Sequence, residues 1–273
     1  MGIAFNDVSF HYKKGNVRGE KVLKGLNLEF KERRCYLLTG PCGSGKTTLA
    51  LLLKGLLLPT SGKILLKNDS ISLSSFQRSI GLAFQSPEEQ FFKETVEEEV
   101  AFGPTMLKLN RIEERVKGGL NTTGLLYEKF SRSSPFALSS GEQRRLAIAS
   151  IIACEPSWYI FDEPTAGLDL EGRSKIIELI KNLMKEKKTV IIISQELERF
   201  IDLCDEIIVL EKGRLKLKTD TKTFLEEEKL DEIEHSLPYH IRVLRILRKR
   251  GWDIPVSITN PQEAADIIAD YEL

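Results

Sequence analysis

The sequence has few residues of the kinds that bind metals or build disulfide frameworks. It contains 4 cysteines and 3 histidines among 273 residues, and no cysteines stand in a CxxC pair. A zinc site or a disulfide-stapled fold is therefore not expected. We interpret Cys35, Cys154 and Cys204 as small apolar residues of a reduced cytosolic protein. Cys42 lies in a glycine-rich loop and is a candidate reactive thiol.

Net charge and long apolar runs are also absent. The 40 basic residues balance the 40 acidic ones, which argues against a nucleic-acid-binding protein held by a strongly basic surface. The most apolar stretch, residues 49–58, is broken by Lys54 and Gly55 and is too short to span a bilayer. The start of the sequence has no basic-then-apolar leader, so secretion is not expected. A role at a membrane would require docking on another protein.

The apolar patterns predict an α/β protein. Residues 3–12 and 22–30 alternate between apolar and polar, which is typical of an antiparallel β layer. Further on, short apolar strands alternate with amphipathic helices, which favours a mostly parallel sheet covered on both faces. The predicted strands are residues 35–39, 62–67, 80–84, 158–161, 189–194 and 206–210, and the predicted core helices are residues 47–56, 171–187 and 197–204. Between about 86 and 155 the pattern is mainly helical, which indicates an inserted helical subdomain.

A phosphate-binding loop follows the strand at 35–39. Residues 40–47 read GPCGSGKT, which matches GxxxxGK[ST] between a strand and a helix. Backbone N–H groups of such a loop surround phosphates, and the helix N-terminus adds its positive dipole end. Lys46 is expected to reach the β- and γ-phosphates, and Thr47 to place its hydroxyl on Mg²⁺. The predicted phosphate-binding set is Gly40, Gly43, Ser44, Gly45, Lys46, Thr47 and Thr48.

Two carboxylates end the apolar strand at residues 158–163 (WYIFDE). Asp162 is suited to the Mg²⁺ shell, because that ion takes a few carboxylates and keeps several waters. Glu163 is then the candidate general base that orients and deprotonates the attacking water. The pair alone would be weak evidence, but together with the phosphate loop it predicts an ATP- and Mg²⁺-dependent hydrolase.

Residues 138–145 (LSSGEQRR) resemble the signature motif of ABC transporter ATPases, and the resemblance extends along nearly the whole chain. The family pattern LSGGQ is matched at Leu138, Ser139 and Gly141, and it is not matched at Ser140 and Glu142. By this resemblance, Ser139 and Gly141 would donate hydrogen bonds to nucleotide held by a second subunit in a head-to-tail dimer. The segment is also typical of an N-capped helix start.

The resemblance assigns the remaining site positions. Tyr12 would stack on adenine, with a core aromatic as the alternative, and Gln85 would sense Mg²⁺ and the attacking water. Residues 166–169 (AGLD), with Asp169 in the nucleotide-binding set, would form the loop through which two sites communicate. Gln195 stands where the family usually has a histidine that contacts the γ-phosphate. The catalytic set is therefore Glu163, Lys46, Gln85 and Gln195, and the Mg²⁺ set is Thr47, Gln85 and Asp162.

Glutamine at position 195 has a consequence for mechanism. It can donate a hydrogen bond, but it cannot become cationic near neutral pH as histidine can. We expect slow hydrolysis at this chain's own phosphate site and a partner ATPase that retains histidine, which favours a heterodimer over a homodimer. The alternative is that glutamine substitutes adequately.

Two segments resemble the ATPases of energy-coupling factor importers, which carry vitamins or transition metals: residues 85–92 (QSPEEQFF) and the tail from Leu237. The implied fold is a P-loop NTPase core with an antiparallel β subdomain, the inserted helical subdomain and a small helical C-terminal domain. The implied domains are 1–229 for the ATPase and 230–273 for a dimerisation element, with helices at 241–250 and from Pro261.

The implied partners are a second ATPase, a transmembrane coupling subunit and a small substrate-capture membrane protein, with no nucleic acid. The chain would lie peripherally on the cytoplasmic face of the membrane, with Gln90, Phe91 and Phe92 beside the docking groove unless the phenylalanines belong to the core. Other readings are the ATPase of another ABC importer class, a regulatory subunit without turnover, or a soluble ABC ATPase of DNA repair or translation. The transported substrate would never touch this chain, so its sequence does not encode it.

Overall fold

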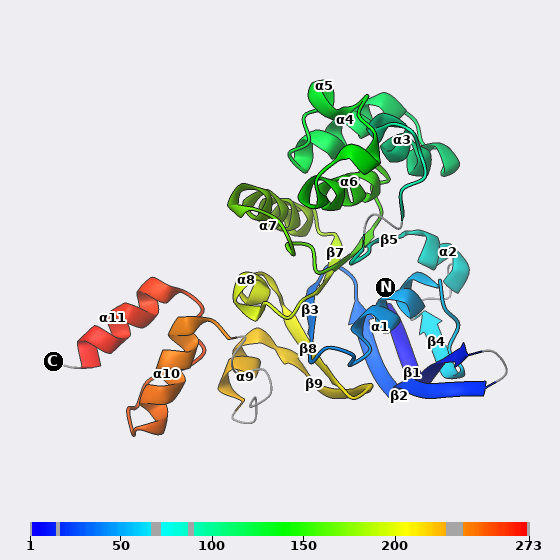
Figure 1. The fold of residues 1–273 in the computed structure, drawn as a ribbon. Coiled ribbons are helices and arrows are strands. Elements are labelled where there is room, and N and C mark those ends of the chain that lie inside the picture. The colour runs from blue at the N-terminus through cyan, green and yellow to red at the C-terminus, as the bar shows by residue number, and fades with distance from the viewer. Residues whose placement is uncertain (1, 15–16, 67–71, 87–89, 228–236, 272–273) are drawn as a thin grey trace.

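The chain forms a central mixed sheet with smaller parts arranged around it (Figure 1). This computed structural model describes residues 2–14, 17–66, 72–86, 90–227 and 237–271. The predicted boundary between residues 229 and 230, and part of the segment 85–92, lie outside the described residues.

The central sheet has the strand order β5-β6-β7-β3-β8-β9. Its parallel strands are β5 (Ile80–Ala83), β6 (Trp158–Asp162), β7 (Thr189–Ile193), β3 (Cys35–Thr39) and β8 (Glu206–Glu211), and β9 (Arg214–Asp220) pairs antiparallel with β8 at one edge. Every residue of β3, β6 and β7 is buried. Strands covered on both faces need apolar side chains on both faces, so their sequences read as continuous apolar runs.

A second, antiparallel sheet covers one face of the central sheet. It consists of β1 (Gly2–Lys14), β2 (Val17–Lys31) and β4 (Ser61–Leu66), in the order β2-β1-β4. Next to it lie α1 (Lys46–Lys54) and α2 (Leu73–Arg78). Apolar residues of this sheet, of α1 and of the central strands form one buried cluster that includes Phe5, Leu49 and Ile191. The antiparallel β layer predicted from alternation is therefore present.

Helices pack against the other face of the central sheet. They are α7 (Leu170–Lys185), α8 (Leu197–Phe200) and α9 (Thr221–Glu226), and their apolar side chains share a cluster with central-strand residues such as Phe161 and Ile192. The predicted helix 197–204 is shorter than expected, because α8 ends at Phe200 and a single 3₁₀ turn follows over Ile201–Leu203. The chain is already extended at Cys204, since the next residue, Asp205, donates its N–H to the Cys35 carbonyl at the edge of β3.

The inserted segment forms a helical subdomain with its own core. It contains α3 (Val96–Met106), α4 (Ile112–Thr122), α5 (Tyr127–Phe130), the 3₁₀ helix Pro135–Ala137 and α6 (Ser140–Ala153). Val100, Leu120 and Leu146 are fully buried between these helices. The subdomain rises above the central sheet in Figure 1, and α6 leads directly into β6.

The C-terminal residues form a small helical unit. Its helices are α10 (Tyr239–Lys249) and α11 (Pro261–Tyr271), close to the predicted positions. Leu244 of α10 and Ala264 of α11 belong to a small cluster of their own, while Ile241 of α10 packs into the cluster beneath the central sheet. Within the described residues, no helix is both long enough and apolar enough to cross a membrane.

Candidate nucleotide site

The phosphate loop joins the end of β3 to the start of α1 through three glycines with positive φ. Gly40, Gly43 and Gly45 have φ of 135°, 75° and 100°, a region that L side chains rarely adopt. A Cβ on Gly40 would come within 2.0 Å of the Leu210 carbonyl oxygen, and one on Gly45 within 2.5 Å of a Leu23 methyl carbon. The glycines therefore let the backbone fold tightly between β3 and α1.

Two polar side chains of this loop are buried within it. The Ser44 side chain is only 2% exposed, and its Oγ has no hydrogen-bond partner among the described residues. Lys46 Nζ donates to the carbonyl oxygens of Gly40 at 2.7 Å and Pro41 at 2.9 Å. Burial lowers the pKa of Lys46, and the nearby Glu163 carboxylate opposes that shift. A buried hydroxyl without a partner, beside a buried cation, fits the binding of a phosphate group.

Thr47 and Asp162 form the predicted Mg²⁺ pair. Thr47 Oγ1 donates to Asp162 Oδ2 at 2.7 Å, and Asp162 is 3% exposed. Burial raises the pKa of Asp162, and the hydrogen bond from Thr47 opposes the shift. No group of three or more His, Cys, Asp or Glu suited to a metal occurs among the described residues. Two oxygen ligands completed by phosphate oxygens and water are what Mg²⁺ prefers.

Glu163 follows Asp162 in a left-handed backbone conformation, with φ of 49°. Its N–H donates to the Ile193 carbonyl at 2.9 Å. Its carboxylate accepts hydrogen bonds from Ser194 Oγ at 3.0 Å and from the backbone N–H of Gln195 at 3.1 Å. Burial raises the pKa of Glu163 despite these bonds. The end of β7 therefore fixes the candidate base, and a raised pKa suits a general base that works near neutral pH.

The signature segment begins α6 with a capping box. Ser139 is the N-cap residue, and its Oγ and N–H both donate to Glu142 Oε2, at 2.7 and 2.9 Å. Ser139 thus bonds within its own helix start rather than to the phosphate loop of the same chain. Asp169 likewise caps a helix, because its Oδ1 accepts the Gly172 N–H at 2.8 Å at the start of α7.

The other predicted nucleotide-contacting residues are Tyr12 and Gln85. Tyr12 is 45% exposed, and its hydroxyl lies 3.2 Å from Thr48 Oγ1, so an exposed aromatic ring does stand near α1. The Gln85 side chain is exposed. The backbone carbonyl of Gln85 accepts a hydrogen bond from Arg144 Nη2 at 2.9 Å. Arg144 also donates to the Glu163 carbonyl at 2.6 Å. Sequence reasoning missed Arg144, because its position in the signature helix does not predict which carbonyls it meets.

Of the cysteines, Cys42 is exposed and Cys35 and Cys204 are buried, while Cys154 is intermediate. This agrees with the interpretation of Cys35 and Cys204 as small interior residues. The reactivity of Cys42 stays a prediction.

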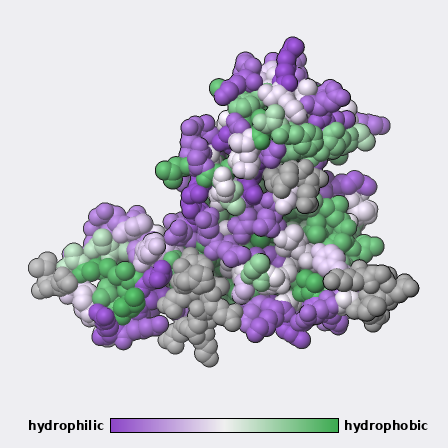
Figure 2. Space-filling model, in the orientation of Figure 1, coloured by the Kyte–Doolittle hydropathy of each residue, from purple (hydrophilic) through white to green (hydrophobic). Residues whose placement is uncertain are grey.

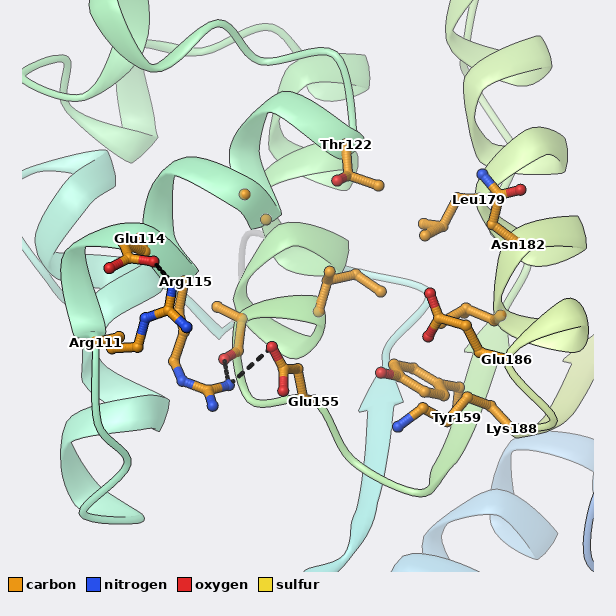
Figure 3. A pocket seen from close by; sticks show the side chains of 15 residues that line it. Arg111, Glu114, Arg115, Thr122, Glu155, Tyr159, Leu179, Asn182, Glu186 and Lys188 are labelled. Carbon is orange, nitrogen blue, oxygen red and sulfur yellow. Dashed lines mark hydrogen bonds and ion pairs between the residues drawn. The ribbon is translucent and has the colours of Figure 1, made fainter.

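Two of the clefts that described residues line are outside the phosphate loop. One, of about 600 Å³, opens between α4, the end of α6 and α7, and Figure 3 shows its charged rim, where Arg115 pairs with Glu155 at 3.1 Å and Arg111 with Glu114. None of the predicted site residues lines it. The other, of about 900 Å³, lies between the helical subdomain and the core and is lined by Lys54, Gln90, Phe91 and Phe102 among others.

These relationships are those of an ABC-type ATPase. A family model described as "ABC transporter" matches residues 23–166, which include the phosphate loop, the signature segment and the Asp162–Glu163 pair. The chain therefore belongs to the ABC transporter family. The predicted family, the predicted fold class and the expected ATPase class are confirmed.

Curated and solved relatives refine the assignment. The chain is 37% identical to the energy-coupling factor transporter ATP-binding protein EcfA2 of Clostridium tetani, over 97% of this chain and 95% of that protein. The structure of cbiO1 from Clostridium perfringens, described as part of the ABC transporter complex cbiONQ, superimposes with a TM-score of 0.69 at 31% identity, covering 92% of this chain and 98% of that one. A dimeric ATP-binding cassette bound to ADP and Pi superimposes with a TM-score of 0.72 at 28% identity, covering 80% and 98%. The predicted resemblance to energy-coupling factor ATPases is confirmed.

Proposed function

We propose that this chain hydrolyses Mg²⁺-bound ATP at a composite site formed with a second ATPase subunit, and that hydrolysis drives uptake of a vitamin or a transition metal. One observation carries the proposal: Lys46, Thr47, Asp162 and Glu163 come from two elements and meet at the phosphate loop.

Each of these residues has a distinct part in the proposed reaction. Lys46 and the loop N–H groups stabilise the charge that develops on the transferred phosphoryl group. Thr47 and Asp162 hold Mg²⁺, which, when bound, neutralises phosphate charge. Glu163 accepts a proton from the attacking water, and its bonds to Ser194 and Gln195 hold its carboxylate in place for that transfer.

The partner subunit completes the site. Ser139 and Gly141 stand at the N-terminus of α6, where backbone N–H groups and the helix dipole favour an anion, and we assign them to the nucleotide held by the partner. Asp169, at the start of α7, links the two sites. The exposed ring of Tyr12 provides a stacking surface for adenine.

The cleft of about 900 Å³ is the proposed docking groove for a transmembrane subunit. Phe91 belongs to the core of the helical subdomain, whereas Phe92 is 58% exposed and packs edge-to-face on Phe102 with ring centroids 4.7 Å apart. Figure 2 shows apolar surface on the side of the helical subdomain that α3 forms. Exposed aromatics beside a groove suit the apolar face of a partner helix. Docking there would hold the chain on the cytoplasmic face of the membrane.

The C-terminal unit, residues 230–273, is the proposed dimerisation element. Tyr239, Val243 and Ile246 are 76%, 44% and 50% exposed. They recur at helical spacing on α10, so one face of this helix presents an apolar stripe. A second ATPase subunit would bury that stripe.

Gln195 favours one second candidate, a regulatory subunit that binds ATP without turnover. Its backbone N–H holds the Glu163 carboxylate, but its side chain cannot supply the cation that histidine can. Single-turnover hydrolysis in the assembled complex separates the two candidates: a chain with a working site converts its own bound ATP, and a regulatory chain does not.

Affinity capture of the tagged chain from detergent-solubilised host membranes tests the assembly. We expect a second ATPase with a histidine at the position of Gln195, together with two kinds of integral membrane protein, and Mg²⁺-dependent ATPase activity in the captured complex. Recovery of the chain alone, or with ribosomes or DNA-repair factors, would contradict the transport proposal.

A further inference from the structure

The Arg144 guanidinium bridges three segments of the chain. It extends from the second turn of α6, in the helical subdomain, to two loops at the edge of the central sheet. Nη1 donates to the Glu163 carbonyl at 2.6 Å, just after β6, and Nη2 donates to the Gln85 carbonyl at 2.9 Å, just after β5. Arg144 therefore connects the helical subdomain to the backbone of two proposed catalytic residues.

Both of these hydrogen bonds are made to backbone carbonyl groups. The planar guanidinium carries donors in a fixed fork, so it sets the separation and direction of the two carbonyls that it meets. Glu163 is the residue for which this matters most, because its φ of 49° is unfavourable for a non-glycine residue. Its N–H is held by the Ile193 carbonyl and its carbonyl by Arg144.

Helix α6 connects the same arginine to the docking groove. Ala147 and Ser150, which follow Arg144 on α6, line the cleft of about 900 Å³. A partner helix in that cleft would press on the helical subdomain from which Arg144 extends. A small displacement of α6 would reach the Glu163 carbonyl through a single side chain.

We propose that Arg144 is a positioning residue that ties the general base Glu163 and the Gln85 loop to the helical subdomain, so that docking of the membrane subunit sets the geometry of hydrolysis. The inference rests on the proposed function, because it takes Glu163 as the base and the cleft as the docking groove. It adds a residue outside the predicted catalytic set, and it specifies the path by which docking would regulate the site.

The test uses the assembled transporter, purified with Arg144→Gln or Arg144→Lys in this chain, and the isolated chain with the same changes. Because a misplacement of about 1 Å can cost on the order of 10²-fold, we expect Arg144→Gln to lower the rate of hydrolysis at this chain's own site in the assembled transporter, measured in a single turnover, by about 10- to 100-fold. Arg144→Lys, which keeps the charge but lacks the fork, should lower it less. Arg144→Lys keeps the positive charge that acts on the Asp162 carboxylate, so its KM for ATP should change by less than about twofold.

Assembly is expected to stimulate hydrolysis. If Arg144 only stabilised the fold, its replacement would lower the hydrolysis rate equally in the assembled and the isolated chain, and the stimulation would not change. We expect the ratio of assembled to isolated single-turnover rates to collapse in Arg144→Gln. Arg132→Gln, a matched substitution at an exposed position of the same subdomain, should retain the wild-type ratio. An unchanged ratio in Arg144→Gln, or an equal loss of rate in both states, would overturn the proposal.

The same measurements separate this inference from the proposed function. If this chain's site in the wild-type transporter hydrolyses its ATP in a single turnover and Glu163→Gln abolishes that hydrolysis, the catalytic assignment stands whatever Arg144 does. Folding is checked by the thermal unfolding midpoint of each isolated variant. If Arg144→Gln fails to fold, Arg144→Lys decides: a wild-type single-turnover rate and ratio in Arg144→Lys would refute a role for the fork.

Discussion

The hydroxyl of Thr47 donates a 2.7 Å hydrogen bond to Oδ2 of Asp162, joining the start of α1 to the end of β6. The residues are 115 positions apart in the chain, so the bond exists only when the central sheet is assembled. It aligns two oxygen atoms of the kind that Mg²⁺ prefers. The relationship can be tested by changing the charge of Asp162 while keeping its shape.

Asp162→Asn should remove the Mg²⁺ dependence of nucleotide binding. The amide oxygen can still accept the Thr47 hydroxyl, so the fold is retained, but the anionic ligand is gone. We expect single-turnover hydrolysis at this chain's own site to fall by at least about 10²-fold, because metal stabilisation of phosphoryl transfer contributes several kcal/mol. Titration with a fluorescent ATP analogue should give similar affinities in EDTA for both proteins. A gain in affinity on adding Mg²⁺ equal to that of wild type would contradict this role.

Glu163→Gln should stabilise the nucleotide-free chain at neutral pH while stopping turnover. Burial raises the folded pKa of Glu163, so the protonated form is favoured by folding and the wild type loses stability as pH rises through that pKa. The neutral amide has no such loss. The unfolding midpoint of the variant should exceed that of the wild type at pH 8, and the difference should shrink towards zero as pH falls into the ordinary carboxyl range.

Glu163→Gln should also slow ATP hydrolysis. Single-turnover hydrolysis of the ATP bound at this chain's own site should be slower by about 10²- to 10⁴-fold in Glu163→Gln, as for the loss of a general base, in the presence of the partner subunits. Differential scanning fluorimetry across pH and single-turnover hydrolysis are the two measurements. A midpoint difference that grows as pH falls would show that Glu163 is stabilised, not destabilised, by ionisation in the folded state.

Much of this site could be predicted from the sequence, because its key residues fall within two short motifs. The phosphate loop and the Asp162–Glu163 pair each follow an apolar strand, and parallel strands end at one edge of a sheet. β9 was missed, because residues 214–220 are charged and half-exposed at the sheet edge and show no buried-strand pattern. Arg144 was missed for a different reason. Its bonds to Gln85 and Glu163 span 59 and 19 positions, and every residue type has a backbone carbonyl, so the sequence does not show which residues accept these bonds.

Gln195→His should raise the steady-state ATPase of the assembled transporter. Gln195 directly follows Ser194, and both hold the Glu163 carboxylate, so a histidine there would add a group able to carry charge beside the same base. We expect a severalfold gain in kcat with little change in KM. An unchanged or lower rate would indicate that glutamine already serves and that slow hydrolysis does not follow from this substitution.

Glu142→Gln should lower the KM for ATP of the composite site. The single hydroxyl proton of Ser139 is donated to the Glu142 carboxylate at 2.7 Å, so it must leave that carboxylate before it can serve the partner's nucleotide. Glutamine still caps the helix but holds the hydroxyl less strongly. We expect the KM for ATP of the assembled transporter to fall by about threefold. Glu98→Gln changes the same position of the α3 capping box and should have no effect; a similar fall there would indicate a general effect of charge.

Phe92→Ala should uncouple the chain from its membrane partner without affecting nucleotide binding. Phe92 and Phe102 form an exposed aromatic pair, and Lys93 Nζ lies 5.2 and 5.0 Å from their ring centroids. Removing one ring exposes no core, because Phe92 is 58% exposed already, so the isolated chain should unfold within about 2 °C of wild type. Buried at an interface, an aromatic anchor is worth about 2 kcal/mol or more.

Co-purification of the membrane subunits with a tagged chain, followed by transport in reconstituted vesicles, measures the loss. We expect Phe92→Ala to weaken assembly by at least about 30-fold, the equivalent of 2 kcal/mol, and to lower transport in proportion. Phe92 packs on Phe102, which lines the cleft. Leu126→Ala, at a residue of the helical subdomain that is 59% exposed and belongs to no such pair among the described residues, is the matched control and should assemble normally. A Phe92→Ala chain that binds ATP, assembles and transports at the wild-type rate would exclude this surface as the docking site and leave the catalytic assignment intact.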